Sequence, residues 1–278
     1  MLIKEVVEKI LVKSGAPRLE LSKTCDLLII GDENAQVKKI ATTFMATVEV
    51  INEAARQGVN FIITHEPTWF TGADNAEWAQ NDPVYQKKKE LIEKNHITIW
   101  RYHDHMHMGT YDGIYTGMDK ELGWSNYQMT EDLPYLFGNQ MKGCYKIPKT
   151  TLRELALNLK SIFEMDVVQI VGNANMPVER VGILVGGGSL GLGVEQMPMQ
   201  VMHDASLDVL ICGDIIEWTL PAYVRDAAAL AINKGMLVLG HERSEEAGMK
   251  HLPTWLESIT EEIPVVFIDA KEPFKYIY

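Results

Sequence analysis

The chain has 278 residues, 46% of them hydrophobic and 23% charged, as is typical of a folded globular protein. Its formal net charge of −12 disfavours general binding to nucleic acid or to an anionic membrane. There is no run of ~18 or more apolar residues, and acidic residues occur early, so neither a membrane span nor a signal peptide is expected. Three widely separated cysteines without a CxxC pair indicate reduced thiols and a cytoplasmic location.

Strand-like and helix-like segments alternate along the chain. Apolar runs of strand length lie at 26–30, 40–45, 61–64, 97–100, 181–185, 209–212, 237–239 and 265–268. Helical patterns separate them at 3–13, 48–57, 83–95, 113–122, 152–163, 220–233 and 249–259. This alternation predicts an α/β fold with largely parallel strands.

The weakest region for regular structure is 127–151, which contains two prolines and two glycines. A lobe boundary is placed there. It gives an N-terminal α/β lobe, 1–127, and a C-terminal α/β lobe, 128–278, with the alternative that the last helix and strand pack back on the first lobe.

Three clusters of histidine and acid follow three of the predicted strands. They are Thr64-His65-Glu66-Pro67, His103-Asp104-His105-Met106-His107 and Gly240-His241-Glu242-Arg243-Ser244-Glu245, and they hold five of the eight histidines. Open α/β folds build their sites at the carboxyl ends of strands, so these side chains are expected to converge on one crevice. A divalent metal is the expected occupant, because imidazole and carboxylate together suit zinc, iron, manganese or nickel.

Spacing within the clusters suggests how each could bind. His241 and Glu245 are four apart and share a face if the chain enters a helix after Gly240. His103, His105 and His107 share one side of an extended chain, whereas in a helical turn His103 and His107 would pair. Both conformations remain open. For any single histidine, a solvated or structural role is the simpler interpretation, but three such clusters at strand ends favour a metal site.

Other motifs are given structural interpretations. Gly186-Gly187-Gly188-Ser189-Leu190-Gly191 fits a dinucleotide-binding fingerprint, yet Asp208 begins a strand rather than ending one, so a tight turn beside the metal crevice is preferred. Cys212 is interpreted as a buried thiol, and the methionine-rich segment 197–202 as adaptable packing or an interface. Trp69 and Phe70 could line a pocket or pack an interface.

At these motifs the chain resembles the Nif-three-like dinuclear-metal proteins, often called GTP cyclohydrolase type 2 homologues. Residues 61–67 are similar to the family's "LIVTHHP" segment, 103–119 to "HTNLD…GGVND", 181–188 to "VAVCGGAG", 208–213 to "DALITG" and 240–245 to "GHYATE". The order and spacing agree over roughly 250 residues. The resemblance implies a two-lobed fold with a metal pair in the cleft between the lobes, and a toroidal homohexamer.

The resemblance also implies a ligand set. It gives His65, Glu66, His107, His241 and Glu245 as ligands of two divalent ions (Zn, Fe or Mn), with Glu245 shared between them. Glu66 replaces a family histidine and His107 a family aspartate, so Asp104 and His105 remain possible substitutes. His103 matches a histidine near the site, whereas Glu217 and Trp218 replace histidines of relatives.

The expected function is metal-dependent hydrolysis, with Glu66, His103 and Asp104 as catalytic candidates. The substrate implied by the resemblance is a nucleotide or a related small molecule, for which Arg101, Arg225 and Arg243 are the phosphate-binding candidates. The alternatives are a non-catalytic metal-loaded oligomeric scaffold or regulatory partner, and a structural metal site with four protein ligands per ion.

Overall fold

The computed structural model describes residues 1–129 and 143–277, which form two compact α/β units. Unit 1 comprises Met1–Gly117 and Glu246–Lys271, and unit 2 comprises Met118–Glu245 and Glu272–Tyr278. The division falls within helix α5 (Gly113–Leu122) and within helix α9 (His241–Thr260). The predicted α/β class is confirmed.

The sheet of unit 1 has the order β1-β4-β3-β2-β10, with bounds β1 Leu28–Ile30, β4 Thr98–Arg101, β3 Phe61–Thr64, β2 Ile40–Thr43 and β10 Val265–Phe267. The last four run parallel, and β1 is antiparallel to β4. The C-terminal strand β10 pairs with β2, so the end of the chain completes the sheet that its first part begins.

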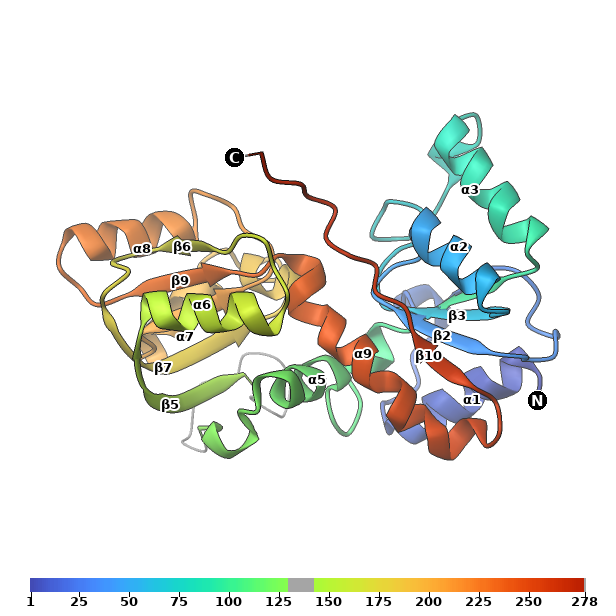
Figure 1. Ribbon diagram of the computed structural model, residues 1–278, viewed down its shortest axis with the longest axis horizontal. Coiled ribbons are helices and arrows are strands. Elements are labelled where there is room, and N and C mark those ends of the chain that lie inside the picture. The colour runs from blue at the N-terminus through green and yellow to red at the C-terminus, as the bar shows by residue number, and fades with distance from the viewer. Residues whose placement is uncertain (130–142, 278) are drawn as a thin grey trace. The chain divides into compact units, whose positions relative to one another are not determined.

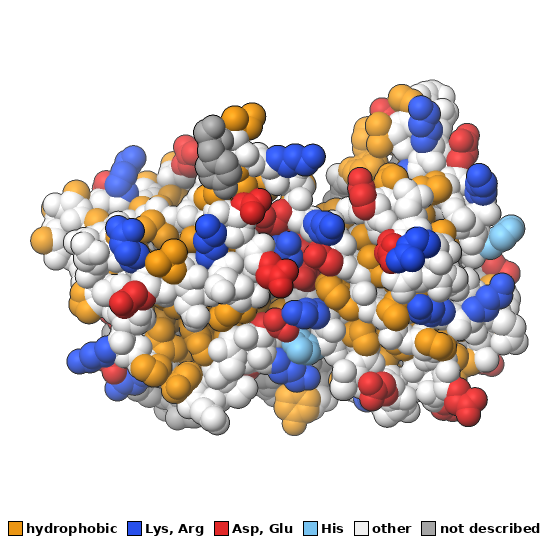
Figure 2. Space-filling model, viewed as in Figure 1, with side chains coloured by type: hydrophobic (Ala, Val, Ile, Leu, Met, Phe, Trp, Pro, Cys, Tyr) orange, Lys and Arg blue, Asp and Glu red, His pale blue; other side chains and the backbone are white. Residues whose placement is uncertain are grey.

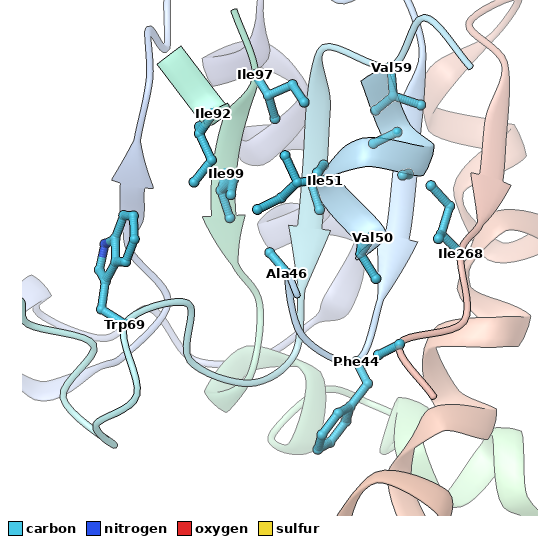
Figure 3. Packing of buried hydrophobic residues seen from close by; sticks show 14 of the residues in the cluster. Phe44, Ala46, Val50, Ile51, Val59, Trp69, Ile92, Ile97, Ile99 and Ile268 are labelled. Carbon is cyan, nitrogen blue, oxygen red and sulfur yellow. The ribbon is translucent and has the colours of Figure 1, made fainter. Parts of the chain in front are cut away.

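Helices cover both faces of this sheet (Figure 1). On one face lie α2 (Val48–Arg56) and α3 (Pro83–Lys94), whose apolar side chains pack on alternate residues of the central strands. Figure 3 shows Ile51 of α2 beside Ile97 and Ile99, and Val50 of the same helix on the side of Ile268, all in one core cluster. The other face carries α1 (Ile3–Ser14) and α9.

Helix α9 contains Pro253, which has no N–H to donate to the carbonyl four residues earlier. That carbonyl belongs to Met249, and it accepts a 2.8 Å hydrogen bond from the hydroxyl of Thr42 in β2. The Thr42 hydroxyl therefore donates the hydrogen bond that Pro253 cannot donate to the carbonyl of Met249. This allows helix α9 to continue through the proline without an unsatisfied carbonyl.

The sheet of unit 2 has the order β5-β7-β8-β9-β6, with bounds β5 Cys144–Thr151, β7 Pro177–Leu184, β8 Val209–Cys212, β9 Gly235–Val238 and β6 Gln169–Val171. The three central strands are parallel and the two edge strands antiparallel. Helix α6 (Leu152–Ile162) lies on one face and α7 (Met197–Asp204) on the other (Figure 1). Helix α8 (Leu220–Ala229) packs in the same core cluster as α7.

Some expectations for regular structure need correction. The weak region 127–151 ends in the eight-residue strand β5, and β6 was not predicted at all. Helix α9 begins at His241, not near 249. The cluster at 103–107 is the short helix α4 (Asp104–His107), which excludes the extended alternative. One proline and one glycine of the weak region, Pro134 and Gly138, lie outside the described residues.

Candidate metal centre

His65 and Glu66 lie directly after the last residue of β3. The parallel neighbours β3 and β4 end side by side, so the residues that follow them meet at one sheet edge. His65 is fully buried, and its Nδ1 lies 3.2 Å from the carbonyl oxygen of Tyr102, just past β4. The backbone N–H of Glu66 donates to Phe44 O at 2.8 Å, which fixes the turn.

Arg101 holds this turn in place. Its buried guanidinium donates to Glu66 Oε2 at 2.9 Å, to the carbonyl of His65 at 3.0 Å and to that of Gly72 at 2.7 Å. These three bonds orient the Glu66 carboxylate and tie the loop after it to β4. Arg101 is therefore a positioning residue, and the structure gives no support to its expected role in binding phosphate.

The short helix α4 is set by a buried carboxylate far away in sequence. Asp26 accepts from the backbone N–H groups of His103, Asp104 and His105 at 2.6, 2.8 and 2.9 Å. In a fourth contact, its Oδ2 lies 2.7 Å from His105 Nδ1. The cap makes the helical turn that places His103 and His107 on one face, while His105 is buried against Asp26.

Three imidazoles of unit 1 lie against one another. The ring centroids of His65 and His103 are 4.5 Å apart, those of His65 and His107 5.0 Å, and those of His103 and His107 4.9 Å. One ring nitrogen from each lies within 4.8 Å of the others, a spacing that one ion can bridge. The helical turn thus brings together three histidines from the first two predicted clusters.

Each of these rings has an oxygen acceptor at Nδ1. Besides Tyr102 O for His65, His103 Nδ1 lies 3.0 Å from Asp104 Oδ1 and His107 Nδ1 lies 2.9 Å from Asp112 Oδ2. Because an oxygen acceptor requires the hydrogen on Nδ1, the Nε2 of the neutral ring carries the lone pair. Metal-binding histidines are commonly oriented in this way.

Electrostatics agree with a neutral His65 and an ionised Asp104. Burial, with the nearby imidazoles His103 and His107, lowers the pKa of His65 well below its usual value, so His65 is neutral at physiological pH. The hydrogen bond from His103 holds the pKa of Asp104 well below its usual range, and bonds from Cys25 and Thr24 add to this. Asp104 therefore serves better to orient His103 than to exchange a proton.

Unit 2 carries a second imidazole–carboxylate pair. His241 and Glu245 occupy the first turns of α9, and His241 Nε2 lies 3.1 Å from Glu245 Oε2. Asp214, two residues past β8, lies 2.8 Å from His241 Nδ1. Gly186, at a φ of 45°, brings its backbone so close that a Cβ there would lie 2.6 Å from His241 Nε2 and collide with Glu245 Oε1.

The chemistry of these donors fits a divalent cation. Imidazole nitrogens with occupied Nδ1 atoms, beside buried carboxylates, are the ligand types that zinc, iron and similar ions take. Within the described residues, unit 1 gathers His65, His103 and His107, with Glu66 Oε1 3.6 Å from His103 Nε2. Unit 2 gathers His241 and Glu245.

Of the residues that orient these histidines, sequence reasoning singled out Asp104 and missed Asp26, Asp112 and Asp214. Asp112 could have been found as a helix N-cap, because aspartate is favoured there. Its carboxylate accepts from the N–H groups of Ile114 and Tyr115 at the start of α5. Asp214 follows a strand end, as the histidine clusters do. Asp26 had no such signal, because its partners lie 77 to 79 residues away.

The structural interpretations of the other motifs hold. The glycine segment forms a five-residue 3₁₀ turn, Gly186–Leu190, rather than the start of a helix of the dinucleotide-binding kind. Cys212 is fully buried, and burial raises its pKa. Met197 and Met202 pack in the core of unit 2, and Trp69 packs on Tyr85 in unit 1 whereas Phe70 is exposed.

The remaining candidates lie on the surface or in tight packing. Glu217 and Trp218 are exposed on the loop after β8. Arg225 is exposed, and the mostly buried Arg243 lies 3.3 Å from Glu242. None of the helices in residues 1–129 and 143–277 is both long and apolar enough to cross a membrane.

The fold and the candidate site define an α/β protein of two units with histidine and carboxylate groups at its strand ends. The chain belongs to the DUF34/NIF3 family, whose model, described as Duf34/NIF3 (NGG1p interacting factor 3), matches residues 3–273. This confirms the family resemblance predicted from the sequence motifs.

Relatives agree in sequence and fold. A GTP cyclohydrolase 1 type 2 homolog of Chlamydia muridarum is 25% identical over 249 residues, covering 89% of this chain and 90% of that protein. A homolog of the same name from Clostridium perfringens is 23% identical over 257 residues, or 90% of each chain. A Bacillus cereus protein related to NIF3 superposes with a TM-score of 0.75 at 16% identity, covering 100% of this chain and 99% of that one.

Proposed function

We propose that this protein is a divalent-metal-dependent hydrolase that binds two ions per chain and acts on a nucleotide or a related small molecule. The observation that carries the proposal is the oriented histidine set: in His65, His103, His107 and His241, an oxygen acceptor lies at Nδ1. The names of the relatives, GTP cyclohydrolase 1 type 2 homologs, support the substrate class.

Each unit contributes its own ligands to this proposal. In unit 1 these are His65, Glu66 and His107, with His103 as a neighbour. In unit 2 they are His241 and Glu245. A divalent ion, when bound, lowers the pKa of a coordinated water toward ~7 and polarises the bond under attack.

The chain's own residues would provide orientation and proton transfer. Arg101 fixes one oxygen of Glu66, while the other faces His103, so this carboxylate can accept a proton at Oε1 without moving away from the site. Asp104 and Asp112 keep His103 and His107 in one tautomer through their Nδ1 contacts.

Metal content and turnover test the proposal together. Protein purified without chelator is expected to hold close to two divalent ions per chain, and His241→Ala to lose at least one. GTP and a panel of nucleotides and other heterocycles are then incubated with metal-free protein and with protein reloaded with Zn²⁺, Fe²⁺ or Mn²⁺. His203→Ala is the matched control, because this exposed histidine pairs with Asp204 away from both ligand groups.

Turnover that disappears with the metal and returns on reloading is the expected result. Equal turnover by metal-free protein would reject the metal-dependent mechanism. Full metal content in His241→Ala would remove His241 from the ligand set. Stable loading without turnover across the panel would reject hydrolysis and favour the scaffold or regulatory role.

A further inference from the structure

We propose that the loop 108–112 of unit 1 binds the flat ring of a heteroaromatic substrate, and that Tyr111 is the specificity-determining residue on which this ring stacks. Phosphate groups of the ligand contribute little to binding at this loop. The assignment deepens the proposed function and rests on it for the presence of a substrate. It narrows that substrate to a molecule recognised through an uncharged ring.

The loop 108–112 begins and ends at a histidine of the candidate site. It follows His107 directly, and its last residue, Asp112, returns to place Oδ2 2.9 Å from His107 Nδ1. Consecutive Cα atoms are about 3.8 Å apart, so Met108 and Tyr111 start one residue away from the two sides of this contact. A ligand held on these two side chains is therefore close to the imidazole of His107.

The middle of the loop is fixed to the end of helix α1. The backbone N–H of Thr110 donates at 2.8 Å to the carbonyl of Ser14, the last residue of α1. That carbonyl is one of those that a helix end leaves without a partner inside the helix. Gly109 packs so closely against it that a Cβ would lie 2.9 Å from the oxygen. Because the loop is held at both ends and at its centre, its backbone does not have to be ordered when a ligand binds.

Two large side chains of this fixed loop are exposed to solvent. Tyr111 is 71% exposed and Met108 is 47% exposed. An exposed tyrosine ring can stack with a planar heteroaromatic group, and such stacking does not depend on the hydrogen-bonding pattern of that group. Methionine is flexible and polarisable, so it adapts to the edge or face of a ring. The loop thus offers a preformed apolar surface for a flat ring next to the candidate site.

The charge of the surrounding segment disfavours anions. From Tyr102 to Asp119 the sequence contains three aspartates and neither lysine nor arginine. Arg101, directly before this segment, is buried and donates to Glu66 and to two backbone carbonyls. A phosphate at the loop would therefore meet carboxylates without a lysine or arginine from this segment, whereas a neutral ring is not repelled. The segment is better suited to the ring of a nucleotide-like molecule than to its phosphates.

Calorimetric titration of the full chain, purified without chelator, tests the assignment with three probes. Guanosine and guanosine 5′-monophosphate are expected to differ in Kd by less than about threefold, and ribose 5-phosphate, which lacks the ring, to bind at least about tenfold more weakly. Tyr111→Ala should raise the Kd of guanosine about tenfold, as for the loss of one stacked ring, whereas Tyr111→Phe should stay within about twofold. Trp78→Ala is the matched control, because Trp78 is an exposed aromatic residue of the same unit on the separate 3₁₀ helix η2 (Glu77–Ala79).

Three results would overturn the assignment. The first is an unchanged affinity of Tyr111→Ala for guanosine, or no binding of guanosine, adenosine or pterin at millimolar concentration. The second is a monophosphate that binds more than about tenfold tighter than guanosine and loses this advantage as salt is added, because phosphate would then be recognised. The third is a changed sedimentation coefficient in Tyr111→Ala, which would assign the loop to an interface between chains.

Metal content separates this assignment from the proposed function. Elemental analysis of Tyr111→Ala is expected to equal that of wild type, because the substitution leaves the histidines and the oxygen acceptors at their Nδ1 atoms in place. Since the titrations follow binding alone, the ring site can stand where no hydrolysis is found. It can also fail while metal-dependent turnover of a substrate without an aromatic ring remains.

Discussion

At the scale of single residues, the site is distinguished less by its histidines than by the oxygens behind them. The Nδ1 of His65 lies beside a backbone carbonyl oxygen. The Nδ1 atoms of His103, His107 and His241 lie 3.0, 2.9 and 2.8 Å from carboxylate oxygens. Such partners fix both the ring plane and the tautomer, which lowers the cost of ordering a ligand when an ion binds. The exposed His203 also has a carboxylate oxygen, from Asp204, 2.9 Å from its Nδ1, so such a partner indicates a site only where several histidines with one lie together.

The loop that follows Glu66 is held by an unusual buried lysine. Lys88 of α3 donates to Thr68 O at 2.7 Å, and its ammonium lies 4.9 Å from the ring centre of Phe70. Asp74 closes the same loop by accepting from the N–H groups of Thr68 and Trp69. Burial lowers the pKa of Lys88 from 10.5 to about 8, although the charge of Asp74 opposes this.

This lowered pKa predicts how stability changes with pH. Between pH 8 and 10.5 the unfolded chain keeps a proton on Lys88 that the folded chain has lost, so the free energy of unfolding rises with pH in that interval. At ~1.36 kcal/mol per pH unit, the rise attributable to Lys88 is about 3 kcal/mol.

Urea unfolding of wild type and Lys88→Met from pH 7 to 11 measures the difference. The difference in free energy of unfolding between wild type and Lys88→Met is expected to change by about 3 kcal/mol between pH 8 and 10.5. Lys89→Met, at an adjacent and more exposed lysine, is the matched control and should run parallel to wild type. A constant gap for Lys88→Met would show that Lys88 titrates normally in the folded protein.

At the scale of elements, the contact between Thr42 and α9 gives a sharper stability prediction. Thr42→Val keeps the side-chain shape but leaves the carbonyl of Met249 without the hydroxyl that compensates for Pro253. An unsatisfied buried carbonyl costs about 1–3 kcal/mol, so the free energy of unfolding should fall by that amount.

A double-mutant cycle isolates this effect from general packing. Pro253→Ala supplies an N–H that can bond to Met249 O within the helix, so Thr42→Val should cost less in that background. Chemical unfolding of the four proteins gives the coupling directly. Equal costs of Thr42→Val in both backgrounds would show that the hydroxyl does not replace the bond lost at the proline.

How far the sequence predicts the elements depends on burial. The strands β3 and β8 match their predicted bounds, because a strand buried on both faces is a continuous apolar run. The two edge strands of unit 2 lack that pattern: β5 and β6 have exposed residues and polar positions, and both were missed. Their pairing is antiparallel and depends on β7 and β9, which no local pattern reveals.

The candidate site was predictable to a similar extent. Clusters after strands made His65 and His107 candidates at the edge of the first sheet, and His241 and Glu245 candidates at the edge of the second. Their role as ligands stays a prediction. The conformation of residues 103–107 was not predictable, since Asp26 caps that turn from 77 residues away. Nor could the sequence show that Arg101 holds Glu66, since an arginine that ends a strand could equally face solvent.

At the scale of the whole molecule, charge limits what the surface can bind. Figure 2 shows Lys and Arg side chains interspersed with Asp and Glu on the face in view. With a net charge of −12, the average field attracts cations and repels polyanions, so electrostatics assist metal uptake more than the approach of a triphosphate. A nucleotide would therefore have to be recognised mainly by short-range contacts.

The final prediction concerns assembly, which the family resemblance implies is a homohexamer. Each chain exposes large apolar side chains such as Trp78 and Trp218, which association could cover, while six chains of charge −12 repel one another. Sedimentation at micromolar concentration is expected to give a species near six times 31.4 kDa. Raising the salt concentration from about 50 to 300 mM should strengthen the assembly, because it screens that repulsion. Trp78→Ser and Trp218→Ser test the two apolar sites separately, and dissociation of either variant would place its tryptophan at an interface. A monomer at both salt concentrations, with and without added Zn²⁺, would reject the hexamer.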